Sequence, residues 1–444
     1  MEYNRFNLYL KTIEKPFRKL SKIEFLQPDD SVAFSISNNY KRGYSSKYDS
    51  RAFLQDGSLG ISMKNGARRS ASITLANVDD AFLYSVNKLW FGSRVRLSMG
   101  CILQDGTEFY LPQGVFYLAN PNNNISPSSK TISYSLKDKW SYLDGSLFGT
   151  LPNSYTVREN TDVFFAMQNV LWFSKRNMTE IATDKFLMLD ATPPVFPVYY
   201  NDKVVNYTVV NPDGTQTPKT TTKNMTAFST TVEMGKTAAD ILLGLNKNLV
   251  GLIGYDQTGA LRVEPSQYDI LDIEKPVLHT FSPSNSIFLG QDESINVSEV
   301  FNNVIAVGEG LKSSTVYAIA TNQDPSSDTN ANLIGLKTCK ENNSELWNKE
   351  QCADYADYIL KQKTVLRKSV TIQSAQMFHL YENALIAIKR TDKEGSPVEN
   401  HLIQSINIPI GETGSMTIKA VSVNDYPIST ITLPPDPPES NLDP

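Results

Sequence analysis

The stretch from Arg94 to Pro121, RVRLSMGCILQDGTEFYLPQGVFYLANP, constrains the fold more than any other part of this sequence. Its first half alternates between two kinds of residue: apolar Val95, Leu97 and Met99, and polar Arg94, Arg96 and Ser98. A period of two is typical of a strand with one buried face. Asp105-Gly106 follows, and glycine tolerates the positive φ that a tight hairpin turn needs. We therefore expect a β-hairpin with one apolar face.

The rest of residues 1–148 has the same character. Alternating segments at 31–37 and 70–78, and a further apolar run at 131–136, predict more strands joined by short polar connections. This density of strands indicates a small β-barrel or sandwich. The first domain is therefore expected to span residues 1–148.

Residues 149–295 change to an α/β pattern. One amphipathic helix is expected from Asp162 to Lys175, and a second begins at Thr237, with Asp240 in the capping-box position. Between them, residues 192–224 form a strand-rich insertion with a Pro-Asp-Gly turn, which we expect to be exposed. A strand, turn and strand around Gly259 complete this middle domain.

Strands return in residues 296–430, which we expect to form a second β domain with one helix. The helix, at 344–363, places four apolar residues on one side: Cys352, Ala356, Ile359 and Leu360. A second clear hairpin carries an apolar stripe on both arms: Ile406, Ile408, Ile410, Met416, Ile418 and Ala420. Residues 431–444 are rich in proline and are expected to be an extended tail. Two β domains around a middle one raise the hypothesis of an ancient structural duplication.

Composition narrows the function classes. The chain has 444 residues and a formal net charge of −5, which argues against a general phosphate-binding surface. Basic clusters at 15–22 and at Arg68-Arg69 are interpreted as solvated faces. The three cysteines form no CxxC pair, the N-terminus lacks the apolar core of a secretory signal, and no stretch is long enough for a membrane span. We expect a soluble protein made in a cytoplasm.

The sequence contains no strong catalytic, cofactor or metal signature. Gly235-Lys236-Thr237 precedes a helix, but the glycine that a phosphate-binding loop needs five positions earlier is replaced by Thr230. The three histidines are widely spaced, which favours surface or interface positions over a zinc site. Paired carboxylates for glycoside hydrolysis stay open as an alternative. A sugar-binding platform of aromatic residues is also open, although core or interface packing is the commoner use of such residues.

Several segments, taken in order, resemble phage baseplate hub proteins, in particular the tail-associated hubs of phages and prophages of Gram-positive hosts. The resemblance covers about residues 20–425, and its motifs are loose patterns. The segments that carry it are 89–121 with 131–145, 237–265, 300–310, 351–363 and 403–423.

The resemblance implies an α+β, mainly β fold with two tail-tube-like β-barrel domains and an α/β middle region. It implies a homotrimer whose barrels adapt a sixfold tail tube to a threefold spike or tip and form part of the DNA channel. It also implies contacts with the tail tube or distal tail protein, the spike or tip protein and the tape measure protein, with DNA passing without specific binding. Such a protein would be assembled in the bacterial host cytoplasm and reside in the virion tail baseplate.

The resemblance implies no catalytic residue, cofactor or metal. Residues expected at an interface are Arg94, Arg96, Phe109, Tyr110, Phe116 and Tyr117. Two other functions remain as alternatives: a tail-associated cell-wall hydrolase, and a carbohydrate-binding tail protein that recognises the host.

Overall fold

The structure is a computed structural model of the whole chain. It describes residues 2–27, 30–39, 54–77, 80, 82, 93–127, 129–179, 194–196, 204–210, 216–222, 224–226, 229–249, 251–264, 275–284, 288–295, 298, 300–308, 315–343, 346, 349–364, 368–391, 393, 395, 397–411, 413–423 and 429–434.

The N-terminal β region, here called lobe 1, contains seven antiparallel strands. They are β1 (Lys19–Leu26), β2 (Val32–Ser37), β3 (Leu54–Ser62), β4 (Arg69–Ala76), β5 (Arg94–Ile102), β6 (Glu108–Ile125) and β7 (Lys130–Asp138). The predicted hairpin is β5 and β6, with a turn at Gly106, whose φ is 79°. Val95, Leu97 and Met99 are fully buried. The predicted strand and its apolar face are therefore confirmed, but the other face is not exposed, because Arg94 and Ser98 are buried as well.

The second β region, here called lobe 2, contains six strands. They are β14 (Val277–Phe281), β15 (Phe288–Ile295), β19 (Lys368–Ser374), β20 (Leu385–Lys389), β21 (Val398–Pro409) and β22 (Met416–Ser422). The predicted second hairpin is β21 and β22, and its six stripe residues are all at most 2% exposed. The mainly β, α+β fold class is confirmed. The expected division at residues 148, 295 and 430 stays a prediction, although β14 and β15 precede residue 296 and pair within lobe 2.

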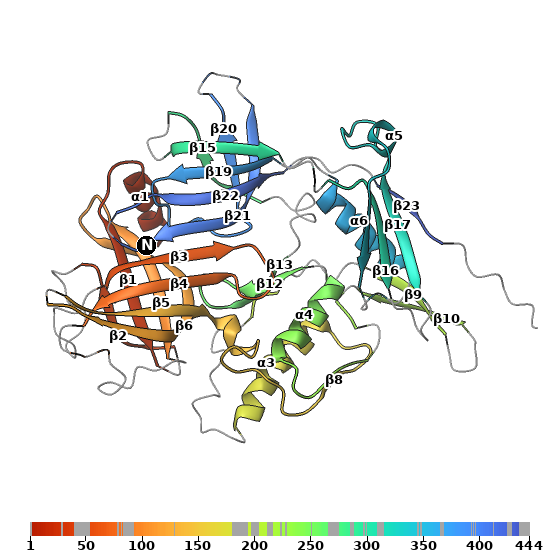
Figure 1. Cartoon of the computed structure of the whole chain (residues 1–444), viewed down its shortest axis with the longest axis horizontal. Helices are drawn as coiled ribbons and strands as arrows, with labels where there is room; N and C mark the ends of the chain where they lie inside the picture. Colours follow the sequence, from red (N-terminus) through yellow and green to blue (C-terminus); the bar gives the residue numbers. More distant parts are fainter. Residues whose placement is uncertain are drawn as a thin grey trace, which may run out of the picture.

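The two lobes share one strand order. Across the sheet, lobe 1 runs β1-β5-β6-β7-β4-β3 and lobe 2 runs β14-β20-β21-β22-β19-β15, so corresponding strands occupy corresponding places (Figure 1). Two features differ. β2 extends lobe 1 beyond β1, and β14 lies parallel to β20 whereas β1 is antiparallel to β5. The common order supports the hypothesis of a structural duplication.

A helix that the sequence analysis did not predict opens the chain. α1 (Glu2–Ile13) places Tyr9 and Ile13 in a hydrophobic core to which both lobes contribute. Phe6 also packs against this core, so apolar residues recur at helical spacing along one face of α1.

The middle region is a smaller unit with its own core between two helices. Its elements are η1 (Lys139–Tyr142), β8 (Tyr155–Val157), α3 (Val163–Thr179), β9 (Val204–Val210), β10 (Gln216–Thr222), β11 (Thr230–Val232), α4 (Ala238–Leu249), β12 (Leu252–Tyr255) and β13 (Leu261–Glu264). Both expected helices are confirmed, and the Asp162 carboxylate accepts a hydrogen bond from the Phe165 N–H at 2.8 Å at the start of α3. The strands β9 and β10 lie in the expected insertion, whose Pro-Asp-Gly turn lies outside the described residues.

An outer module lies at the opposite end of the molecule from α1, and all of it except its last strand is inserted between β15 and β19 (Figure 1). It contains β16 (Asn303–Gly308), β17 (Val316–Asn322), α5 (Ala331–Ile334), β18 (Thr338–Asn342), α6 (Lys349–Lys363) and β23 (Ser429–Thr432). The buried residues of α6 are the four predicted ones. β23 pairs with β17 and includes the first residues of the expected tail, and residues 435–444 lie outside the described part.

Candidate functional site: the junction between the lobes

One strand joins the two lobes into a single sheet. β21 pairs with β20 through its first residues and with β22 along its other edge. Its last residues, Ser405–Pro409, pair antiparallel with β3, from Ser62 back to Ser58. Beyond the strand, the Ile410 N–H donates to the Gly57 carbonyl at 2.8 Å. The lobes are therefore joined by backbone hydrogen bonds as well as by side-chain contacts.

The side chains at this seam are apolar. Ile406 lies opposite Ile61, and Ile408 lies opposite Leu59. All four are at most 2% exposed and belong to the hydrophobic core that extends through both lobes. Cross-strand pairs of this kind stabilise an antiparallel sheet through packing of their side chains.

The buried Lys19 of β1 forms hydrogen bonds with the backbone at the end of β21. The Lys19 ammonium donates to the carbonyl oxygens of Pro409 and, at 2.7 Å, of Gly411. Ser21, two residues further along β1, donates its hydroxyl to the Ile410 carbonyl at 3.0 Å. Burial lowers the pKa of Lys19 to about 7, and the Asp56 carboxylate opposes this shift. Lobe 1 thus binds the polar backbone of lobe 2 where the strand pairing ends.

Arg69 makes a bidentate ion pair at the junction. Its guanidinium donates to both carboxylate oxygens of Glu382, at 2.8 and 2.5 Å, and to the Tyr255 carbonyl at 2.8 Å. Glu382 belongs to the connection between β19 and β20, and Tyr255 belongs to β12. One side chain therefore contacts lobe 1, lobe 2 and the middle region.

Arg68 and Asp138 complete this charged cluster. The Asp138 carboxylate accepts the backbone N–H groups of Arg68 and Arg69, at 3.1 and 2.9 Å. Burial raises the pKa of Asp138, against the lowering effect of these hydrogen bonds. Arg68 packs so closely on Gly254 that a Cβ there would lie 2.5 Å from its Nε. The interpretation of Arg68-Arg69 as a solvated face is wrong, because carboxylates from distant segments let both guanidinium groups become buried.

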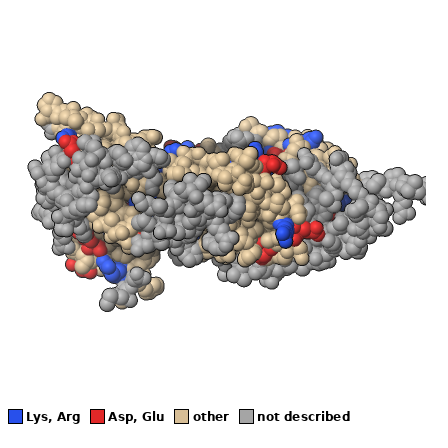
Figure 2. Space-filling model, turned by 90° about the horizontal axis from the view of Figure 1, so that it is seen from below, with Lys and Arg blue, Asp and Glu red and all other residues tan. Residues whose placement is uncertain are grey.

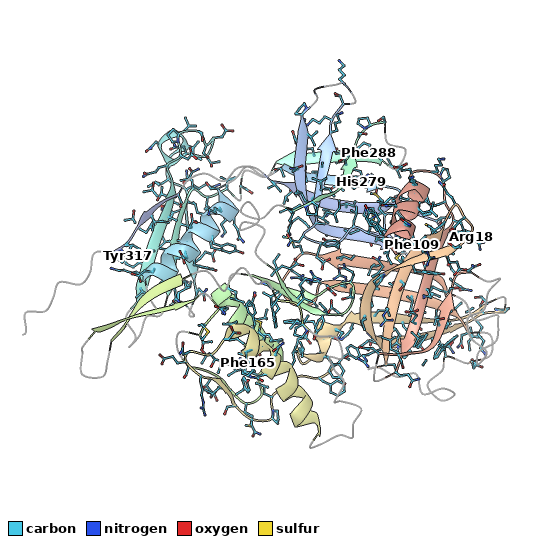
Figure 3. All side chains as sticks on the ribbon, turned by 180° about the vertical axis from the view of Figure 1, so that it is seen from behind. Arg18, Phe109, Phe165, His279, Phe288 and Tyr317 are labelled. Carbon is cyan, nitrogen blue, oxygen red and sulfur yellow. The ribbon has the colours of Figure 1, made fainter. Side chains whose placement is uncertain are left out.

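Two histidines, His279 and His379, lie at the junction, and the His379 ring packs edge-on against the rings of Phe6 and Tyr9 in α1. Figure 3 shows His279. The Tyr9 hydroxyl accepts the Phe378 N–H at 2.8 Å and shares a hydrogen bond with His379 Nδ1 at 3.2 Å. The ring centroids of His279 and His379 are 6.4 Å apart. Burial lowers the pKa of each to about 4, and for His379 the neighbouring His279 adds to the effect. His401 is buried, at 1% exposure, whereas His279 and His379 are half-buried. A surface position is therefore wrong for His401, and the expectation of surface or interface positions stays a prediction for the other two.

Three of the six residues expected at an interface lie mainly inside lobe 1. Phe116 is fully buried in the shared core, and Tyr117 stacks on Tyr142 at 4.6 Å between ring centroids. Arg94 is 8% exposed and pairs with Asp30 at 2.8 Å. These side chains support the β5–β6 hairpin from within.

The other three are partly exposed. Arg96 pairs with Glu24 at 3.4 Å. Phe109 lies 5.2 Å from the Tyr9 ring, against α1 (Figure 3). Tyr110 lies under the Lys22 ammonium at 4.8 Å. The structure does not gather the six residues into one surface, and their role at an interface stays a prediction.

The sequence analysis missed the residues that hold the junction together. Lys19 and Glu382 follow no periodic pattern, and their partners are hundreds of positions away. Tyr9 did carry a signal, since Phe6, Tyr9 and Ile13 have the spacing of one helix face. That spacing could have predicted both α1 and its buried side.

The rejected phosphate-binding loop is a helix cap. The Thr237 N–H donates to the Asp240 carboxylate at 2.8 Å, and the Asp240 N–H donates to the Thr237 hydroxyl at 3.2 Å. This reciprocal pair is a capping box, which confirms the prediction at the start of α4. Among the described residues, no group of three or more potential ligands could hold a metal ion, and no helix is long and apolar enough to cross a membrane.

Comparisons by sequence find nothing: no protein-family model and no curated protein matches the chain. Comparisons by structure find similar proteins. The fold is similar to that of the tail protein from Neisseria meningitidis MC58, with a TM-score of 0.54 at 11% identity, covering 92% of this chain and 97% of that one. It is also similar to the 43 kDa tail protein of prophage MuSo2 from Shewanella oneidensis, with a TM-score of 0.51 at 10% identity, covering 91% and 98%. At these identities the likeness shows the fold.

Proposed function

We propose that this chain is a structural hub protein of a phage tail baseplate and that three copies form a ring. The observation that carries the proposal is the pair of lobes with one strand order, joined side by side by β3 and β21. Three such chains would place six similar lobes around one axis, so one polypeptide could match a sixfold tail tube on one face and a threefold spike on the other. The two solved structures compared above are both described as tail proteins, which supports the same assignment.

The proposed partners follow from this position. The tail tube or distal tail protein would bind one face of the ring, the spike or tip protein the other, and the tape measure protein would end near it. DNA would pass through without specific binding. Figure 2 shows one face of the molecule, and on its described part basic and acidic side chains lie in small separate groups and form no continuous basic patch. Assembly would take place in the bacterial host cytoplasm.

The test of the proposal is the mass of the purified protein in solution. Native mass spectrometry and light scattering over a range of concentrations should detect particles of three chains, each of 49.5 kDa. Negative-stain images should show rings with six lobes. A chain that stays monomeric at every concentration, or rings of another symmetry, would contradict the proposal.

We also propose that the chain has no catalytic role. Its buried charged cluster has a structural explanation: Arg69 and Glu382 pair across the two lobes, and Asp138 accepts the backbone N–H groups of Arg68 and Arg69. Purified protein should leave the turbidity of Gram-positive cells unchanged. Clearing that persists through purification would favour the alternative of a cell-wall hydrolase.

A further inference from the structure

One strand edge of lobe 2, on β21, has a partner strand, whereas the corresponding edge of lobe 1, on β6, has none among the described strands. Pairing of β20 with β21 ends at Leu402, and β3 then occupies the same edge of β21. In lobe 1 the pairing of β5 with β6 ends at Tyr117. Beyond that point β6 continues through Asn122–Ile125, where β7 is the sole partner among the described strands. No described strand therefore pairs with the edge of β6 that corresponds to the β3-binding edge of β21.

The strand registers show which residues of the two lobes correspond. In lobe 1, Gly57 of β3 lies opposite Ile73 of β4, and Ile73 lies opposite Tyr134 of β7. In lobe 2, Gln291 of β15 lies opposite Ile372 of β19, and Ile372 lies opposite Ile418 of β22. We match these two rows of residues to each other. The pairing register shifts by one residue at the same place in each edge strand. The shift lies between Leu54 and Asp56 in β3 and between Phe288 and Gly290 in β15. β15 is thus the counterpart of β3, residue by residue.

The same ladder relates β6 to β21. Asn122 lies opposite Ser133 of β7, and Asn407 lies opposite Thr417 of β22. Ser133 and Thr417 are corresponding positions, each one residue before the matched Tyr134 and Ile418. Asn122 is therefore the counterpart of Asn407, which lies in the segment of β21 that binds β3.

We infer that β15 of one copy pairs antiparallel with Asn122–Ile125 of β6 in a second copy and repeats, between chains, the contact that β3 and β21 make within one chain. The inference rests on the proposed function, in which copies lie side by side. The internal register fixes the register of the new contact. It places Asn122 opposite Ser294, Asn123 opposite Glu293, and Asn124 opposite Asp292.

The side chains of the two edges fit each other. Residues 120–125 of β6 are all exposed, and they present asparagine amides to a partner strand. β15 presents Asp292, whose carboxylate can accept hydrogen bonds from those amides, and Glu293, which already pairs with Arg390 at 2.9 Å and keeps further acceptor capacity. Ile125 is 65% exposed, whereas its counterpart Ile410, which lies at the β3 contact, is 1% exposed. Pairing with β15 would cover Ile125 in the same way.

The chemistry also selects the right partner. Two copies of β15 laid edge to edge would bring Asp292 and Glu293 of one copy close to those of the other, and like charges on paired strands are unfavourable. Polar edges resist aggregation of the free chain, whereas the internal seam, formed during folding, is apolar. An unlike pair, β15 with β6, is the combination that these sequences allow.

Because the contact joins two different edges of the chain, each copy can bind one neighbour through β15 and another through β6. Eight strands lie in one path, β15-β19-β22-β21-β3-β4-β7-β6, with β15 at one end. A head-to-tail contact between β15 and β6 extends this path from copy to copy, and such contacts close into a ring when the rotation allows.

Disulfide cross-linking tests the register directly. The Ile410–Gly57 hydrogen bond makes the next pair, Pro409 and Ser58, a non-hydrogen-bonded pair, whose side chains lie close together. Its counterpart between chains is Asn124 with Asp292. Chains carrying Asn124→Cys should be mixed with chains carrying Asp292→Cys, both in a Cys339→Ser background that removes the partly exposed native thiol. Oxidation should give a two-chain product that contains one chain of each kind.

Two controls keep the result interpretable. The pair Asn123→Cys and Asp292→Cys is shifted by one residue, which turns the side chains to opposite faces, so it should give about tenfold less product. The pair Ser58→Cys and Pro409→Cys within one chain should form an internal disulfide and no two-chain product, which checks the register used as the template.

Each outcome has a distinct meaning. Trimers in solution without the Asn124–Asp292 cross-link overturn this inference and leave the proposed hub intact. The cross-link in particles that are not trimeric supports the contact and contradicts the threefold ring. Monomers that give no cross-link at any concentration overturn both.

Discussion

Arg69 and Glu382 are 313 positions apart in the chain and form a bidentate ion pair at the centre of the molecule. Arg69 is 4% exposed and Glu382 is 3% exposed. The pair connects β4 of lobe 1 to the loop before β20 in lobe 2, and Arg69 also binds the middle region through the Tyr255 carbonyl. One pair of charges thus contacts three parts of the protein.

Removing one charge of this pair should destabilise the protein strongly. Glu382→Gln keeps the shape of the side chain but leaves Arg68 and Arg69 with too little negative charge, and we expect the free energy of unfolding to fall by about 3–5 kcal/mol. Denaturant unfolding followed by circular dichroism measures this. The exposed pair of Arg390 and Glu293, at 2.9 Å, is the control, because Arg390→Gln should cost about 1 kcal/mol or less. Equal losses in the two variants would contradict the role of the buried pair.

Mild acid should weaken the junction through the histidines. The pKa values of His279 and His379 are lowered to about 4 in the folded protein, against about 6.5 when unfolded. Between these values the unfolded chain binds more protons, so the free energy of unfolding should fall as the pH drops from 6.5 to 4. The variant His379→Gln should lose stability less steeply across this window. Denaturant midpoints at pH 7, 6, 5 and 4 provide the comparison, and parallel curves for both proteins would refute the assignment.

The apolar seam between the lobes should behave as core. Ile408→Ala removes buried atoms opposite Leu59 and should lower the free energy of unfolding by about 2–5 kcal/mol. Val398 lies on the same strand and is 54% exposed, so Val398→Ala should change stability by about 0.5 kcal/mol at most. Thermal melting of both variants measures the difference. A small effect at Ile408 would mean that the seam contributes little to folding.

The capping box of α4 should act locally. Thr237→Ala removes the hydroxyl that accepts the Asp240 N–H, and we expect a loss of about 0.5–2 kcal/mol. Amide hydrogen exchange within residues 238–249 should become faster in this variant. Thr237→Ser, which keeps the hydroxyl, is the matched control and should exchange like the wild type.

The parts of the fold that could be predicted from the sequence are those specified by neighbouring residues. The β5–β6 and β21–β22 hairpins, the buried side of α6 and the cap of α4 each follow from a short repeat or a fixed spacing. The mainly β class follows from their sum. In β22 and α6 the period of burial and the period of the sequence coincide, whereas in β5 the polar Arg94 and Ser98 are buried as well.

The parts that could not be predicted depend on partners far away in the chain. Nothing near Arg68 or Arg69 indicates that Glu382 and Asp138 will neutralise them. Strand order is also invisible in a single sequence, because a segment such as β3 has the same alternation whether its neighbour is β21 or solvent. The candidate site is made of such long-range pairs, and this explains why the six residues chosen from local pattern do not converge on it.

The pairing of β3 with β21 has a consequence for the order in which the protein is made. β3 leaves the ribosome hundreds of residues before β21, and at roughly 5–20 residues per second the wait lasts tens of seconds. During that time Leu59 and Ile61 belong to an unpaired edge of a newly made lobe. The nascent chain therefore passes through a period in which chaperones can bind this edge, and in which two chains on neighbouring ribosomes can mispair.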